Sequence, residues 1–167
     1  MDRPKELLKP VKVRYVVLSI VIALLLELLP FNRGGTVRWI PDLAAMVVLY
    51  WTINRPSRFG IFAGFFTGLL TDIASASLLG QHALAYSISA YAVESRQRQV
   101  VMYNLGQQSL VVFGLLMGNQ IVMLVARIVL GAPFIGWGFF LSPFVGALLW
   151  PLLTNLLLVP QRYHQAG

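Results

Sequence analysis

The stretch FGIFAGFFTGLLTDIASASLLG, residues 59–80, decides the fold class of this chain. It is apolar and long enough to cross a bilayer as a helix, since a crossing needs about 20 residues. Small residues and one acid recur in it at four-residue spacing: Gly60, Gly64, Gly68, Asp72, Ala76 and Gly80. Four residues is just over one helical turn, so we expect these positions to form one ridge that another helix can approach closely.

The composition extends the membrane interpretation to the rest of the chain. Of 167 residues, 57% are hydrophobic and 11% are charged, whereas soluble domains carry about 25% charged residues. The absence of cysteine excludes disulfides, thiolate metal sites and cysteine nucleophiles. No hydrolase, metalloprotease or phosphate-binding motif occurs, so we expect no enzyme activity, no catalytic or metal-binding residue and no cofactor.

Six apolar segments follow one another along the chain and predict a six-helix membrane bundle. The fourth segment is short, and it either extends through residues 94–99 or forms a re-entrant segment. We expect three parts: a basic cytoplasmic segment (residues 1–14), one membrane domain (15–160) and a cytoplasmic tail (161–167). The predicted spans are Val13–Leu29, Trp39–Ile53, Phe59–Leu79, His82–Val93, Leu110–Leu130 and Phe139–Val159.

The basic residues orient this bundle. The formal charge is +7, and with six crossings ten of the 13 lysines and arginines fall on one side of the membrane. The positive-inside rule then places both termini in the cytoplasm. Because the charges lie in short clusters between apolar segments, they indicate topology and not nucleic-acid binding.

Asp72 is the most informative ionisable residue, because a carboxylate within a membrane span is costly unless a protein group receives it. One interpretation is a proton or ion site, or a polar contact with a partner helix. The alternative is a local role near the periplasmic end of the span, in which the carboxylate bonds Thr71, Ser75 or neighbouring backbone.

Three further charged residues lie near predicted periplasmic ends. Glu27 and Arg127 would neutralise each other if spans one and five are adjacent, and Arg127 could equally pair with Asp72 or Asp42. Alternatively, each side chain reaches the interface separately. Asp42 follows Pro41 at the start of span two, where helix starts favour both residue types.

Spans five and six carry their own polar and small residues. Asn119 and Gln120 lie in the middle of span five, where buried amides usually bond another helix, and a substrate-binding role is the alternative. Gly114 and Gly118 precede them, and Gly146 lies in span six, which predicts further close helix packing.

Several motifs together resemble one known family, the rod shape-determining protein MreD family. They are PDLAAMVVLYW at 41–51, GFFTGLLTDIASASLLGQHAL at 64–84, and Gly146 with Leu149, Trp150 and Pro151 in the last span. The likeness covers nearly the whole chain. It implies a non-enzymatic component of the machinery that builds peptidoglycan during cell elongation, with a fold like that of the six-helix substrate-binding subunits of energy-coupling-factor transporters.

The resemblance also implies partners. MreC is the expected direct partner, and through it the glycosyltransferase RodA, its penicillin-binding transpeptidase and MreB; a homo-oligomer within the lipid bilayer is compatible with the pattern. On this hypothesis the small-residue ridges receive each other or the single transmembrane helix of MreC. The rival function is a substrate-binding membrane subunit of a small-molecule transporter of the vitamin type.

Overall fold

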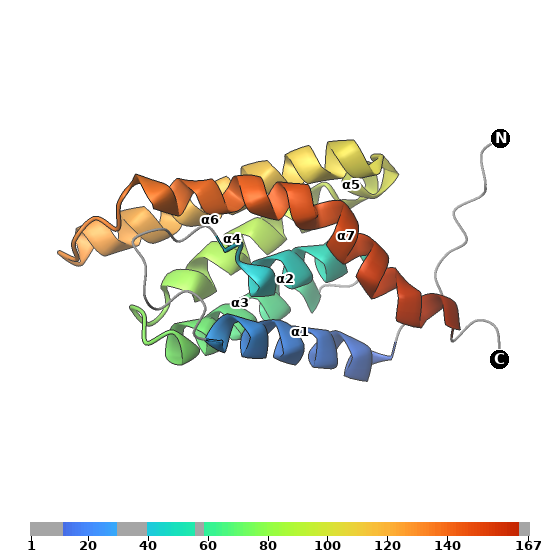
Figure 1. Ribbon diagram of the computed structural model, residues 1–167, viewed down its shortest axis with the longest axis horizontal. Helices are drawn as coiled ribbons and strands as arrows, with labels where there is room; N and C mark the ends of the chain where they lie inside the picture. The colour runs from blue at the N-terminus through green and yellow to red at the C-terminus, as the bar shows by residue number, and fades with distance from the viewer. Residues whose placement is uncertain (1–11, 30–39, 56–58, 164–167) are drawn as a thin grey trace.

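The computed structural model describes residues 12–29, 40–55 and 59–163, and within these ranges the chain is helical with no strand (Figure 1). The predicted segments 1–14 and 161–167 therefore lie mostly outside the described residues. The elements are α1 (Val13–Leu28), α2 (Leu43–Asn54), α3 (Phe59–Ala74), α4 (Gln81–Ser95), α5 (Gln97–Met102), α6 (Leu105–Val129), η2 (Trp137–Leu141) and α7 (Ser142–Tyr163).

Helix α2 forms the centre of the bundle. Every residue from Ala44 to Ile53 is buried, and α1, α3, α4, α6 and α7 all contact this helix. A helix that is apolar on all sides requires such enclosure. Its 12 residues span only about 18 Å at the helical rise, and the surrounding helices cover it along this length.

Helices α3 and α4 form an antiparallel hairpin with the most extensive contact in the bundle. The glycine ridge of α3 faces α4. A Cβ added at Gly68 would lie 2.5 Å from the backbone of His82 and Ala83, and one at Gly64 would lie 2.9 Å from the carbonyl oxygen of Tyr86. The two backbones are therefore too close for any side chain at these positions. The ridge is covered by the chain's own fourth helix, and not by spans five and six or a partner helix.

The ridge is shorter than its spacing predicts, because α3 ends at Ala74 and not at Leu79. Ala76 has a positive φ of 49°, and the amide of Ser77 donates to the carbonyl of Asp72 at 3.0 Å. This pattern closes a helix C-terminus. Ala76 and Gly80 accordingly lie in the turn between α3 and α4, where Gly80 has a φ of 96°.

The other end of the hairpin is fastened by a carboxylate. Glu94, in the last turn of α4, accepts a hydrogen bond from the amide of Gly60 at 3.0 Å. A Cβ at Gly60 would approach this carboxylate to 2.8 Å and the Thr52 side chain of α2 to 2.6 Å. Gly60 is thus needed where α2, α3 and α4 meet.

Helices α6 and α7 pack together along the outside of this group. Gly146 of α7 is buried, and a Cβ there would lie 2.6 Å from Leu116 of α6. Gly114 and Gly118 do not pack against another helix of the chain, because an added Cβ would meet nothing within 4 Å at either position, and their contact with a partner helix stays a prediction. These two glycines do not mediate close packing within the chain.

Two helices of the described chain, Leu105–Val129 and Trp137–Val159, are long and apolar enough to cross a membrane. All six predicted segments contain a helix, but α1, α2, α3 and α4 have only 12 to 16 residues. Span four is a helix that ends at Ser95, and α5 follows it with Val100 buried in the core. Span five begins five residues earlier than predicted, at Leu105.

Candidate functional site: a polar cavity at one end of the bundle

One end of the bundle contains a large cavity. The first turn of α1 and the last turn of α7 lie at the opposite end (Figure 1). The cavity has a volume of about 580 Å³ and lies among the end of α1, the start of α2, the α3–α4 turn, the second half of α6 and the start of α7. Its wall includes the polar or charged side chains of Glu27, Asp42, Gln81, His82, Asn119, Gln120 and Arg127.

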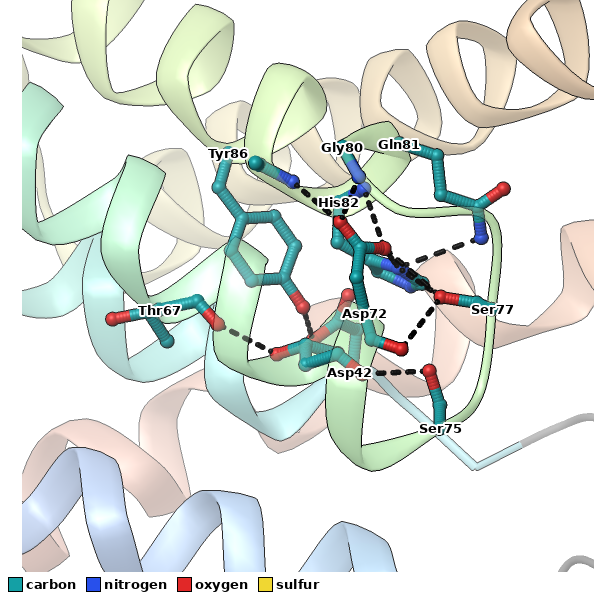
Figure 2. Close-up of polar contacts among 11 residues, drawn as sticks. Asp42, Thr67, Asp72, Ser75, Ser77, Gly80, Gln81, His82 and Tyr86 are labelled. Carbon is teal, nitrogen blue, oxygen red and sulfur yellow. Dashed lines mark hydrogen bonds and ion pairs between the residues drawn. The ribbon is translucent and has the colours of Figure 1, made fainter.

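Asp72 holds the α3–α4 turn together through its hydrogen bonds (Figure 2). Its side chain is 1% exposed. Oδ2 accepts the amide of Gly80 at 2.8 Å, and Oδ1 accepts the amide of His82 at 3.1 Å and the hydroxyl of Ser77 at 2.9 Å. A carboxylate that accepts the first free amides of a helix caps it and complements its dipole.

The geometry therefore favours the local interpretation of Asp72. The partners are backbone amides at the start of α4 together with Ser77 and His82. The hydroxyls of Thr71 and Ser75 instead donate to carbonyl oxygens one turn earlier in α3. Asp72 itself is not among the residues that line the cavity.

His82 was not expected to take part in any site, yet it joins Asp72 to the cavity. Its Nδ1 lies 2.7 Å from Oδ1 of Asp72, and its ring lines the cavity with a side chain that is 15% exposed. The two residues are ten positions apart, and the tight turn at Gly80 brings them together. An acid, a glycine in a turn and a histidine at the next helix start is the sequence signal that would have identified this pair.

Glu27 and Asp42 form an acidic wall at the start of α2. Asp42 accepts the amide of Ala45 at 2.9 Å and caps the helix, as the Pro-Asp pair predicts. Glu27, at the end of α1, accepts the next free amide, that of Ala44, at 2.8 Å. The hydroxyl of Tyr86, from α4, also donates to Asp42. The carboxyl groups of Glu27 and Asp42 thus accept free backbone amides at the start of α2.

Helix α6 provides the opposite wall. Asn119 accepts a hydrogen bond from Ser89 of α4, as expected for a buried amide between helices, but its Nδ2 has no partner. Oε1 of Gln120 and Nε of Arg127 also have no partner. Arg127 lines the same cavity as Glu27 and Asp42, but the ion pair found among the described residues is that of His82 with Asp72. The predicted pairing of Arg127 with Glu27, Asp42 or Asp72 is therefore absent.

The structure brings together six of the residues singled out from the sequence, but at two places. Glu27, Asp42, Asn119, Gln120 and Arg127 share the cavity, and Asp72 bonds His82, which also lines it. The glycines of the ridge lie in the α3–α4 interface and along its turn. Gly114 and Gly118 lie apart from both places, and Gly146 lies where α7 packs on α6.

Comparison with known proteins identifies the family. The sequence model of the rod shape-determining protein MreD family matches residues 11–159. The chain belongs to the MreD family. It is also 32% identical over 137 residues to the rod shape-determining protein MreD of Haemophilus influenzae, an alignment that covers 82% of this chain and 84% of that protein. No solved structure matches the fold.

Membership in the MreD family assigns a role in determining rod shape and places the chain among membrane proteins. The family is a shape-determining component of the cell and not a known class of enzyme.

Proposed function

We propose that this chain is a non-enzymatic scaffold of the cell-elongation machinery, and that a segment of MreC occupies its polar cavity. The observation that supports this proposal is a space of about 580 Å³ lined by polar and charged side chains, among them Glu27, Asp42 and Arg127. A concave space with several polar groups on its wall is the usual form of a binding site.

A protein segment fits this cavity better than a transported small molecule does. The wall is assembled from parts of α1, α2, α6 and α7 and from the α3–α4 turn. The side chains that line it offer both acceptors, such as Glu27, and donors, such as Arg127. A backbone segment offers both kinds of group at short spacing. Membership in a shape-determining family also favours a protein partner over transport.

The orientation follows from the charges. We infer six crossings with both termini in the cytoplasm of the bacterial inner membrane, which places the cavity at the periplasmic face. On this topology the cavity meets the part of MreC that leaves the membrane, and RodA, its transpeptidase and MreB join through MreC. The central α2 is shielded by its neighbours, so its 12 residues need not contact lipid along their length.

The test is an affinity purification of a tagged chain from native membranes dissolved in a mild detergent. Recovery of MreC together with cell-wall synthases supports the scaffold. A tagged membrane protein of similar size that is unrelated to elongation serves as the control for non-specific recovery. Recovery of two ATPases with their coupling membrane subunit, and no MreC, would overturn the proposal.

That second outcome would support the rival function. The energy-coupling-factor type of subunit is also expected to bind its ligand in a cavity between helices, so the presence of the cavity alone does not separate the two functions. The two differ in what fills it: a small molecule that co-purifies with the chain, or a segment of another protein.

A further inference from the structure

His82 is held in one orientation by Asp72 and Tyr86 (Figure 2). Its Nδ1 lies 2.7 Å from Oδ1 of Asp72, and its backbone amide donates to the same oxygen at 3.1 Å. The ring also packs edge-on against that of Tyr86, one turn later in α4, with 5.8 Å between the ring centroids. A side chain fixed by three such contacts keeps its other ring nitrogen in a set direction.

The Asp72 carboxylate determines which ring nitrogen of His82 carries the proton. Both carboxylate oxygens accept backbone amides, Oδ2 that of Gly80 and Oδ1 that of His82. An ionised carboxylate can only accept, so Nδ1 of His82 must donate the hydrogen bond that joins the two side chains. Ser77 and Gln81 also approach Nδ1, but at 3.4 Å, and do not compete with this short contact. In the neutral ring, Nε2 is therefore an acceptor.

Nε2 is the polar atom of this pair that remains for another molecule. Within the part of the chain that the structure describes, Nε2 has no hydrogen-bond partner, and it is not one of the enclosed polar atoms that lack one. The His82 side chain is 15% exposed, and it lines the cavity of about 580 Å³. A rigidly held acceptor is thus presented at the cavity wall.

We propose that Nε2 of His82 accepts a hydrogen bond from an N–H or O–H group of the protein segment that occupies the cavity. Asp72 acts through His82, because it holds the ring in place and keeps the proton on Nδ1. The inference rests on the proposed function, since it names the atom that the MreC segment meets. A ring that is already oriented loses little conformational freedom on binding, which favours a defined contact.

Two substitutions separate the roles of the two ring nitrogens. In His82→Asn the side-chain NH₂ can take the place of Nδ1 and donate to Asp72, but no atom reaches the position of Nε2. In His82→Gln the longer side chain can bring its amide oxygen to the position of Nε2, while the hydrogen bond to Asp72 is lost. The control is Glu94→Gln, which changes a carboxylate outside the cavity that also accepts a backbone amide.

The measurement is binding of purified MreC to the chain in detergent at about pH 8, where a histidine ring in water is neutral. The melting temperature of each variant is recorded as well. We expect His82→Asn to melt as the wild type does and to bind MreC about tenfold more weakly, as for the loss of one hydrogen bond. His82→Gln should melt at a lower temperature but bind MreC more tightly than His82→Asn does. The Glu94→Gln control should bind as the wild type does.

Two outcomes would overturn the inference and leave the proposed function intact. One is equal binding of MreC by His82→Asn and the wild type. The other is an equal loss of binding in both His82 variants, which would show a purely structural role. Failure of the wild type to bind MreC would instead overturn the proposed function, and the inference with it.

A second measurement observes the ring directly by nuclear magnetic resonance. The chain has two histidines, His82 and His164, so isotope labelling of histidine nitrogen gives a simple spectrum that the His82→Asn variant assigns. We expect a proton on Nδ1 and none on Nε2 in the free chain, and a shift of the Nε2 resonance when MreC binds. A proton on Nε2 in the free chain, or an Nε2 resonance that bound MreC leaves unchanged, would contradict the inference.

Discussion

At the residue scale, the space around each glycine decides whether a larger residue could replace it. Gly68 has no space for a methyl group, because the backbone of α4 lies 2.5 Å from where its Cβ would be. Gly118 is also a glycine within a helix, but an added Cβ there would meet nothing within 4 Å. Both positions are glycines within apolar helices, but only Gly68 is packed closely against another backbone.

Gly68→Ala and Gly118→Ala should therefore change stability in opposite directions. Gly68→Ala must move α4 away and should destabilise the protein by about 1–3 kcal/mol, the usual cost of overpacking. Gly118→Ala should stabilise it by about 0.5–1 kcal/mol, because Ala is the better helix former. Thermal unfolding in detergent measures both changes. A Gly68→Ala protein with unchanged melting temperature would contradict the close packing of α3 on α4.

Asp72 provides the second test at this scale. Asn has one acceptor oxygen where Asp has two, and its NH₂ group would face an amide that already donates, such as that of Gly80. Asp72→Asn should cost about 1–3 kcal/mol, the penalty for leaving a buried donor unsatisfied. Glu94→Gln retains the oxygen that accepts from Gly60 and should cost less.

The same variant tests the role of the Asp72 charge. We expect the loss of shape-determining function in Asp72→Asn to follow the loss of folded protein in the membrane. A variant that folds as stably as the wild type and is inactive would show instead that the carboxylate acts in the function itself.

At the element scale, the α3–α4 hairpin joins the ridge to the cavity. Two residues between α3 and α4 have positive φ angles: Ala76 with a φ of 49° and Gly80 with a φ of 96°. Only Gly adopts such values without steric cost. At position 80 the chain therefore has the glycine that the conformation favours, whereas at position 76 it has an alanine.

This difference predicts opposite results for two exchanges in one turn. Gly80→Ala should destabilise the hairpin by about 1–2 kcal/mol, since its added methyl group meets no atom and the cost is conformational. Ala76→Gly should stabilise it by up to about 1 kcal/mol. Melting temperatures measure both, and a stabilised Gly80→Ala protein would contradict the observed turn.

The elements also show what the sequence could predict. Apolar length and glycine spacing identified six helical segments and a close-packed face on α3, and the Pro41-Asp42 pair identified a helix start. The end of α3 was misplaced because its last predicted residues remain apolar, and the helix is stopped by Asp72 and Ser77 through bonds to the next helix. No local pattern reveals a stop of that kind.

The cavity itself could not be predicted from the sequence. Its wall combines Glu27, Asp42, Gln81, Asn119 and Arg127, which are separated by up to 100 positions, and their meeting depends on how the helices pack. The sequence did mark four of these residues as polar groups within apolar segments. Of the two alternatives for the charged residues, a pairing of Arg127 with Glu27, Asp42 or Asp72 is not found among the ion pairs of the described residues.

At the scale of the whole molecule, the topology can be measured without background, because the chain has no cysteine. Six crossings place the exposed Pro133 on the periplasmic side and the exposed Arg98 on the cytoplasmic side. We expect a membrane-impermeant maleimide to label Pro133→Cys in cells with a permeabilised outer membrane, and Arg98→Cys only after lysis. The reverse labelling would contradict the orientation.

The most direct measurement for the whole account is site-specific photo-crosslinking in growing cells. A photoreactive amino acid replaces Ser75 at the cavity or, as a control, Leu148 on the outer face of α7, which is 80% exposed. The account predicts that MreC crosslinks from Ser75 and not from Leu148. A crosslink to MreC from Leu148 alone would contradict the claim that the cavity receives the partner.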